Sequence, residues 1–188
     1  MTFALRIIIG AWLVFMATWF VGWFFTKKGV VGRRWTVTWF QLALYAAFLI
    51  AAQFPGVRSI LAGNWISAVF PAAAWIGALL AVAGIGLAIW ARMFIGANWG
   101  QPMTLRVGHE LVTSGPYRYV RHPIYSGVLL AMLGTAIASQ LLWLAVFLMF
   151  AGFFTYSARM EERTMTEQFG DAYRTYKAQT RMLVPFIF

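Results

Sequence analysis

A run of 20 residues from Ile7 to Thr26 contains no charged side chain. As an α-helix rising about 1.5 Å per residue, the run can cross the roughly 30 Å hydrocarbon core of a membrane. The residues before Lys27 are bulky and contain no small-x-small cleavage site, so we expect a retained span rather than a signal peptide. Hydrophobic residues make up 62% of the 188-residue chain and charged residues only 11%, which predicts a polytopic membrane protein.

Further apolar segments complete the predicted bundle. Trp35 to about Phe54 and Pro71 to about Ala91 are each predicted to form one span. Pro123 to Ala158 holds 36 residues. As one helix it would be about 54 Å long, more than a bilayer requires. Its polar break at Ala138-Ser139-Gln140 therefore predicts two antiparallel arms, the first short for a full crossing. We expect an all-α membrane helical bundle of about five transmembrane helices, the last two forming a hairpin.

The basic residues predict the orientation of this bundle. Of the 15 lysines and arginines, 13 fall on one side of the predicted spans, and only Arg6 and Arg58 fall on the other. The positive-inside rule then places the N-terminus outside and the C-terminus in the cytoplasm. Because the basic residues alternate with apolar spans, the net charge of +10 reflects membrane topology rather than a nucleic-acid partner.

Acidic residues divide the single predicted domain into two regions. All five lie after residue 109, so residues 1–92 are expected to be a three-span scaffold and residues 93–188 to bind the cofactor and carry out the chemistry. Glu161 to about Lys177 is predicted to form a cytoplasmic helix that bends or restarts near Phe169-Gly170. Met182 to Phe188 is expected to return to the membrane surface. The chain has no cysteine and two histidines, and no metal site is expected.

The polar residues of the second region form a cluster in two parts. Gly115 to Tyr125 holds arginine, histidine and tyrosine, and Arg159 to Arg163 holds two adjacent glutamates. The predicted hairpin brings both parts to the same membrane face. Taken singly, these residues have ordinary explanations as juxtamembrane anchors, interfacial tyrosines or a solvated helix face. Together they favour a mixed-charge site for a zwitterionic, partly cationic ligand, because charges at a membrane boundary are costly unless paired or functional.

Both parts of the cluster resemble the isoprenylcysteine carboxyl methyltransferase family, which is related to the phospholipid N-methyltransferases. The first motif is Leu111-Val112-x-x-Gly115-Pro116-Tyr117-x-x-Val120-Arg121-His122-Pro123-x-Tyr125-x-Gly127. The second is Glu161-Glu162, followed by Phe169-Gly170-x-x-Tyr173-x-x-Tyr176. The resemblance covers about half of the chain. It implies S-adenosylmethionine as the cofactor, bound by cytoplasmic segments beneath a C-terminal helix.

The resemblance also implies roles for individual residues. Arg121 or His122 is expected to bind the cofactor carboxylate, and Glu161 or Glu162 its ammonium group. Tyrosines can supply hydroxyl groups or an aromatic face to the sulfonium or adenine. Arg159 is expected to hold an acceptor carboxylate, oriented by Glu162. The expected cofactor-binding residues are Val112, Gly115, Tyr117, Arg121, His122, Tyr125 and Glu161, and the expected catalytic residues are Arg159 and Glu162.

The acceptor implied is a lipophilic or prenylated molecule that reaches the site from the membrane lipid. An isoprenylcysteine-type carboxylate is the leading expectation, since it is ionised at neutral pH and needs no general base. A phospholipid amine and a small thiol are alternatives within the methyltransferase reading. Two other functions stay open. The basic residues could bind the phosphates of NADPH in a membrane sterol-type reductase, or the chain could be a non-catalytic scaffold.

Overall fold

Five α-helices make up most of the part of the chain that the structure describes, which is residues 2–25, 30–31, 54–56, 70–99, 105–106 and 110–185. This computed structural model confirms the all-helical class for those residues. The helices are α1 (Phe3–Trp23), α5 (Pro71–Ile95), α6 (Pro123–Ala138), α7 (Leu141–Phe169) and α8 (Asp171–Gln179). The shorter elements are η1 (Gly96–Asn98), η2 (Gly115–Arg118), and the antiparallel strands β1 (Val30–Val31) and β2 (Leu105–Arg106).

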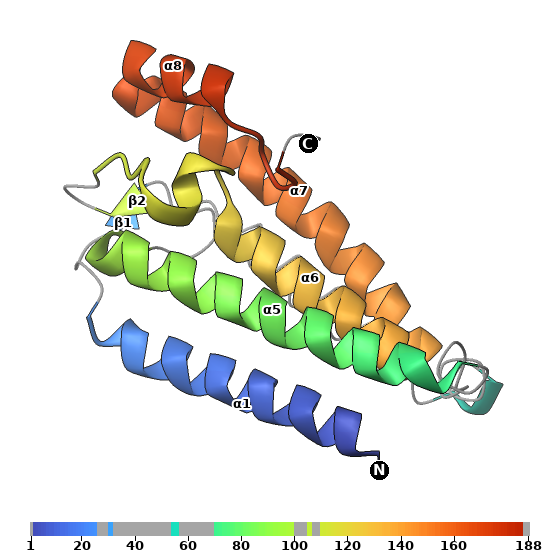
Figure 1. The fold of residues 1–188 in the computed structure, drawn as a ribbon. Coiled ribbons are helices and arrows are strands. Elements are labelled where there is room, and N and C mark those ends of the chain that lie inside the picture. The colour runs from blue at the N-terminus through green and yellow to red at the C-terminus, as the bar shows by residue number, and fades with distance from the viewer. Residues whose placement is uncertain are drawn as a thin grey trace.

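The long helices form the membrane-embedded body of the protein. Within the described residues, α1, α5 and α7 are long and apolar enough to cross a membrane, whereas α6 is a shorter apolar helix of 16 residues. Figure 1 shows α1, α5, α6 and α7 side by side, with α6 and α7 joined as the predicted hairpin. The predicted span from Trp35 to Phe54 lies almost wholly outside the described residues, so the count of five spans stays a prediction.

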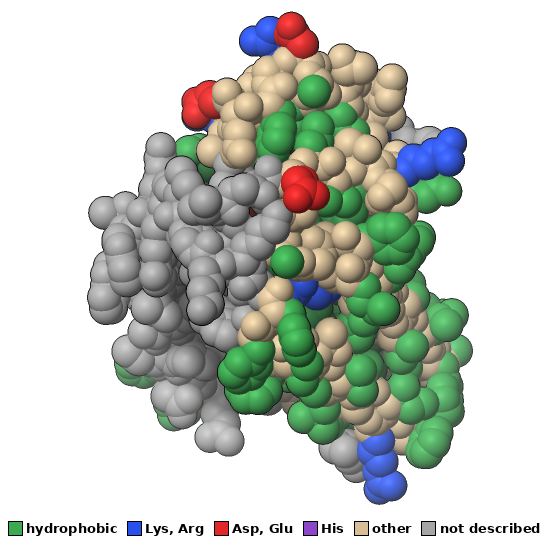
Figure 2. Space-filling model, turned by 90° about the vertical axis from the view of Figure 1, so that its left-hand side faces the viewer, with side chains coloured by type: hydrophobic (Ala, Val, Ile, Leu, Met, Phe, Trp, Pro, Cys, Tyr) green, Lys and Arg blue, Asp and Glu red, His purple; other side chains and the backbone are tan. Residues whose placement is uncertain are grey.

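Acidic side chains gather toward one end of this body, whereas the exposed Arg6 lies near the N-terminus at the other end. On the face drawn in Figure 2, the acidic groups lie toward the upper end, and hydrophobic side chains dominate the surface below them. The upper end holds α8 and the C-terminal turns of α7, as Figure 1 shows. This segregation is expected of an integral membrane protein, because lipid-facing surfaces exclude charge.

Helix α7 is longer than the sequence predicts. We expected a span ending near Ala158 and a separate helix from Glu161, but one continuous helix runs to Phe169. No glycine or proline lies between Ala158 and Phe169, so nothing in the backbone interrupts the helix. It ends where Gly170 adopts a φ of 53°, which is the predicted break before α8.

Small residues let α5 and α6 pack at very short range. A Cβ atom added to Gly84 would lie 2.5 Å from the amide nitrogen of Ala131 and would also clash with the carbonyl oxygen of Gly127. Such close backbone contact is typical of membrane helices with small residues at their interface. Both helices carry the same spacing of small residues, which the sequence reading overlooked. The positions are Gly77, Ala81, Gly84 and Ala88 on α5, and Gly127, Ala131, Gly134 and Ala138 on α6.

Polar contacts fasten α1 to the other helices at two levels. Arg92 is 6% exposed, and its guanidinium donates to the carbonyl oxygens of Gly22 and Gly96, both at 2.7 Å. Its Cζ atom also lies 4.8 Å from the ring centroid of Trp99. Further along α1, the Trp12 indole donates to the Thr135 hydroxyl at 3.1 Å. Arg92, which the sequence suggested as a topology signal, therefore joins the ends of α1 and α5.

The segment after α8 returns to the start of α6. The amide of Arg121 donates to the Arg181 carbonyl at 2.8 Å, and the amide of His122 donates to the Met182 carbonyl at 3.1 Å. Met182 and Leu183 are buried at 8% and 5% exposure. We expected this tail at the membrane surface, but these two residues pack inside the protein. Their apolar side chains extend the core beside α6.

Candidate active site

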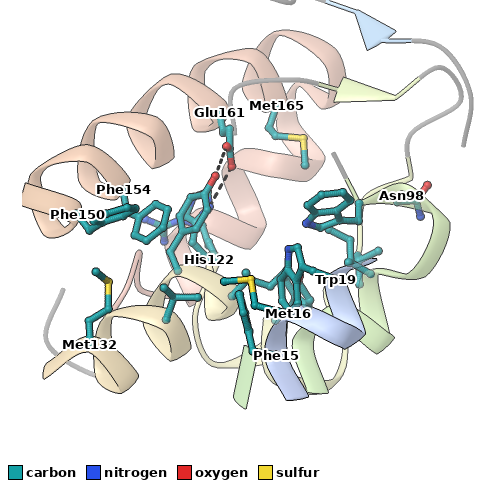
Figure 3. Close-up of a pocket in the computed structure, with 18 of the residues that line it drawn as sticks. Phe15, Met16, Trp19, Asn98, His122, Met132, Phe150, Phe154, Glu161 and Met165 are labelled. Atoms are coloured by element: carbon teal, nitrogen blue, oxygen red, sulfur yellow. Dashed lines mark hydrogen bonds and ion pairs between the residues drawn. The ribbon is translucent and has the colours of Figure 1, made fainter. Parts of the chain in front are cut away.

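A cavity of about 590 Å³ lies where the acidic end of the protein meets the apolar helix bundle. Residues of α1, α5, α6, α7 and α8 form its wall, together with residues of η1, of η2 and of the segments next to them. The close-up in Figure 3 shows Glu161 and Met165 on one side and Phe15, Met16 and Trp19 on the other. The polar wall residues are Asn98, Tyr117, Arg121, His122, Tyr125, Glu161, Tyr173 and Tyr176, and the remaining wall is apolar.

Glu161 is the centre of the polar wall. The Tyr125 hydroxyl donates to its Oε1 atom at 2.5 Å, and His122 Nδ1 lies 3.4 Å from its Oε2 atom. Figure 3 draws both interactions. The Tyr125 ring lies nearly parallel to the rings of His122 and Phe154, with centroid distances of 5.5 and 4.5 Å. Phe154 and Glu161 are two helical turns apart, so the uninterrupted α7 presents both to the same cavity.

Glu162 lies behind the cavity wall and joins three elements. It is 5% exposed, and its oxygens lie 2.6 Å from Arg121 Nε and 2.7 Å from Lys177 Nζ. Arg121 also donates to the Thr180 carbonyl at 2.5 Å. These contacts connect the start of α6, the last turns of α7 and the end of α8. Glu162 therefore fastens α8 to α7 and to the start of α6, while Glu161 faces the interior of the cavity.

The tyrosines of the polar wall are neutral hydrogen-bonding groups. The Tyr176 hydroxyl donates to the Tyr117 carbonyl at 2.6 Å, and the Tyr117 hydroxyl donates to the Ala91 carbonyl at 3.4 Å. Burial raises the pKa of Tyr117, Tyr173 and Tyr176 well above the usual value for tyrosine. These phenols therefore stay protonated and add no negative charge beside the two glutamates.

The structure brings together most of the residues that the sequence analysis selected. Gly115 is not among the wall residues. Gly115 has a φ of 58°, and any side chain at this position would clash with the Phe94 ring. Gly115 therefore has a structural role at the start of η2. Arg159 is exposed and is also absent from the wall, because it lies on a different face of α7 from Glu161. Glu162 is adjacent to Arg121 rather than to Arg159. The selected residues that line the cavity are Val112, Tyr117, Arg121, His122, Tyr125 and Glu161.

The sequence analysis missed the wall that α1 contributes. Trp12, Phe15 and Trp19 form a continuous aromatic contact, edge to face at 5.5 Å and then stacked at 4.1 Å between ring centroids. From the sequence alone, these residues are interpreted as ordinary lipid-facing or packing aromatics of the first span. Their spacing of three and four residues, which puts them on one helix face, was the available signal.

Protonation of His122 is expected to make stability depend on pH. Burial disfavours the charged imidazole, but the carboxylates of Glu161 and Glu162 outweigh burial and raise the pKa of His122 above its usual value. The resulting stabilisation is complete below about pH 6.5 and is lost as the pH rises through the higher pKa of the folded protein. The thermal midpoint of the purified protein should therefore fall as the pH is raised above this value. His122→Gln should remove this dependence.

Wild type and His122→Gln are compared over the same pH range. The other histidine of the chain, His109, lies outside the described residues and is kept in both proteins. An equal pH dependence in wild type and His122→Gln would contradict the role assigned to the two carboxylates.

These features define an integral membrane protein whose polar site opens into an apolar, bundle-embedded cavity. Residues 72–172, more than half of the chain, match the phospholipid methyltransferase family. The chain belongs to this family of S-adenosylmethionine-dependent membrane methyltransferases. The predicted family resemblance is thereby confirmed.

Individual relatives differ in what their names state. The chain is 39% identical over 74 residues to methanethiol S-methyltransferase 1 of Bradyrhizobium diazoefficiens, covering 37% of this chain and 24% of that protein. It is 36% identical over 81 residues to a probable protein-S-isoprenylcysteine O-methyltransferase of Oryza sativa subsp. indica, covering 42% of each. The matches thus span less than half the length of these curated relatives.

A solved structure has the same fold over most of the chain. It is a eukaryotic intramembrane Ras methyltransferase, isoprenylcysteine carboxyl methyltransferase. The TM-score is 0.55 at 25% sequence identity, and the match covers 84% of this chain and 55% of the other. The membrane fold expected from the resemblance is therefore confirmed at the level of the family.

Proposed function

We propose that the protein transfers a methyl group from S-adenosylmethionine to the carboxylate of a lipophilic, isoprenylcysteine-type acceptor. The observation that carries this proposal is the continuity of one cavity, from the polar wall at Glu161 to an apolar wall formed by α1, α6 and α7. The polar end suits the charged groups of the cofactor. The apolar end suits a prenyl chain, since ligand cavities match apolar wall to apolar ligand surface.

The polar wall supplies both charge types that the cofactor requires. Arg121 and His122 are the proposed partners of its carboxylate, and Glu161 of its ammonium group. Tyr117 and Tyr125 are proposed to contact it through hydroxyl groups and ring faces. When bound, the cofactor supplies an electrophilic methyl group, whose bonding electrons stay on sulfur as an acceptor carboxylate oxygen forms the new bond.

Methylation of a carboxylate requires the protein mainly to position the two reactants. A carboxylate is already ionised at neutral pH, so no side chain has to remove a proton. The protein must instead hold the two reactants together and exclude water from them. Arg121 and His122 line the cavity and are the proposed partners of the cofactor carboxylate, whereas Arg159, selected from the sequence for the acceptor carboxylate, is exposed and outside the cavity wall. The sequence-based proposal for Arg159 would require the acceptor head group to reach another face of α7.

Methylation of a small thiol is a second candidate, supported by the similarity to the methanethiol enzyme. The cavity favours the lipophilic acceptor over this candidate. The cofactor is proposed to fill the polar end of the cavity, and a one-carbon thiol would cover little of the apolar wall, so burial of that wall would contribute little to its binding. A phospholipid amine remains the third candidate, because Glu161 could bind an amine as well as the cofactor ammonium.

Transfer of a labelled methyl group to a panel of acceptors tests the proposal. Purified protein in lipid should methylate N-acetyl-S-farnesylcysteine, and the product should be a base-labile methyl ester. Phosphatidylethanolamine and methanethiol are the competing acceptors in the panel. Preferred transfer to either of them would replace the proposed acceptor. Thermal stabilisation by NADPH but not by S-adenosylhomocysteine would overturn the methyltransferase assignment for this chain.

A further inference from the structure

Trp12 of α1 lines the apolar part of the cavity, and its position is here called the floor of the cavity. It packs against two separate groups of buried residues. The first group surrounds the cavity and includes Phe15 and Met132. The second lies below Trp12 and consists of Ala4, Ile8, Ala78, Ala81 and Ala138. Trp12 thus lies between the cavity and a second buried group that contributes no residue to the cavity wall.

Hydrogen bonding fixes the orientation of this indole. Trp12 Nε1 donates to Thr135 Oγ1 at 3.1 Å, and Thr135 Oγ1 donates to the Ala131 carbonyl at 2.8 Å. Thr135 is 4% exposed, so its hydroxyl is held in the core. The edge-to-face contact with Phe15, which itself stacks on Trp19, restrains the indole from the other side. A chain longer than the cavity would have to displace a side chain that is held on two sides.

The floor lies far from the polar wall. Met132, one turn before Thr135, is ten residues along α6 from His122, which corresponds to about 15 Å of helix. In Figure 3, Met132 lies at the opposite end of the cavity from Asn98. An acceptor whose reacting group lies beside His122 and Glu161 therefore extends its apolar chain toward Trp12.

We propose that Trp12, oriented by Thr135, determines the longest apolar chain that the cavity accepts. This inference rests on the proposed function, because it assumes a lipophilic acceptor in the apolar part of the cavity. Removing the indole joins its volume to the cavity, so a longer chain gains apolar contact that it cannot make in the wild type. Trp12 is a specificity-determining residue, and Thr135 positions it.

A series of prenylated cysteines measures this effect. Wild type and variants are compared on N-acetyl-S-geranyl-, S-farnesyl- and S-geranylgeranylcysteine by kcat/KM and by thermal shift in the presence of S-adenosylhomocysteine. Trp12→Ala should raise the relative kcat/KM for the longest chain by about tenfold. Thr135→Val should move the preference in the same direction by a smaller factor. Thr135→Ser, which keeps the hydroxyl, should retain the wild-type preference.

The neighbouring residue supplies a matched control. Leu13 is 64% exposed on the lipid-facing side of α1, and Leu13→Ala should leave the chain-length preference unchanged. An unchanged preference in Trp12→Ala overturns the inference while leaving the proposed function intact. If that variant does not fold, an unchanged preference in Thr135→Val overturns it. Failure of the wild type to methylate any member of the series overturns the proposed function, and the inference with it.

Discussion

Replacing Glu161 by glutamine is expected to weaken binding of S-adenosylhomocysteine by about 10- to 100-fold, because the substitution removes the proposed charged partner of the ligand ammonium group. Glu161 faces the cavity, where its oxygens contact Tyr125 and His122. A glutamine side chain keeps the size of the group and one acceptor oxygen, so the protein should remain folded. Titration calorimetry in detergent gives the affinity, and thermal unfolding confirms the fold.

The adjacent glutamate should respond differently to the same substitution. Glu162→Gln leaves Arg121 and Lys177 without their carboxylate, and Arg121 is largely buried. Breaking a buried pair in this way costs about 3 kcal/mol, which corresponds to a fall of about 6–12 °C in the thermal midpoint. Glu167→Gln, at an exposed position on the same helix, is the control for both measurements. Equal loss of affinity and stability in the two variants would contradict the separate roles of Glu161 and Glu162.

Adding one methyl group at Gly84 is expected to destabilise the protein by about 2 kcal/mol, although alanine is the better helix former. The new Cβ would meet backbone atoms of Gly127 and Ala131, which cannot move without separating α5 from α6. The change should lower the thermal midpoint by about 4–8 °C. Thermal unfolding in detergent measures this difference directly.

Gly86 provides a matched control two residues away on the same helix. A Cβ at Gly86 has no neighbour within 4 Å, so Gly86→Ala should leave stability unchanged or raise it slightly. If the two substitutions change stability in opposite directions, the lack of space at residue 84, rather than helix propensity, explains the requirement for glycine there. Equal effects at both positions would contradict the close packing of α5 on α6.

Several parts of the site could be predicted from sequence because each rests on a local pattern. Pro123 and the polar break near Ser139 define the hairpin, and the hairpin places His122 near Glu161. The mixed charges of the cluster predict a site for a zwitterionic ligand, which stays a prediction. These inferences depend on helix length, on the cost of charge in lipid and on residues that are close in the chain.

Other parts depend on which residues of different helices face one another. Glu161 and Glu162 are adjacent in the sequence, but the rotation of about 100° between neighbouring helical residues turns one into the cavity and the other toward Arg121 and Lys177. The same rotation, together with the uninterrupted course of α7, turns Arg159 away from the cavity. No pattern around these three residues reveals which face of the helix is covered.

The sequence by itself determined a membrane protein with a mixed-charge site at one end of a helical hairpin, because apolar length and charge distribution are properties of the chain alone. Only the tertiary structure decided that α1 supplies an aromatic wall and that Trp12 lines the cavity. Those contacts join residues more than a hundred positions apart, as the hydrogen bond from Trp12 to Thr135 illustrates. They follow from how the small-residue faces of α5 and α6 pack and from where α1 then rests on them.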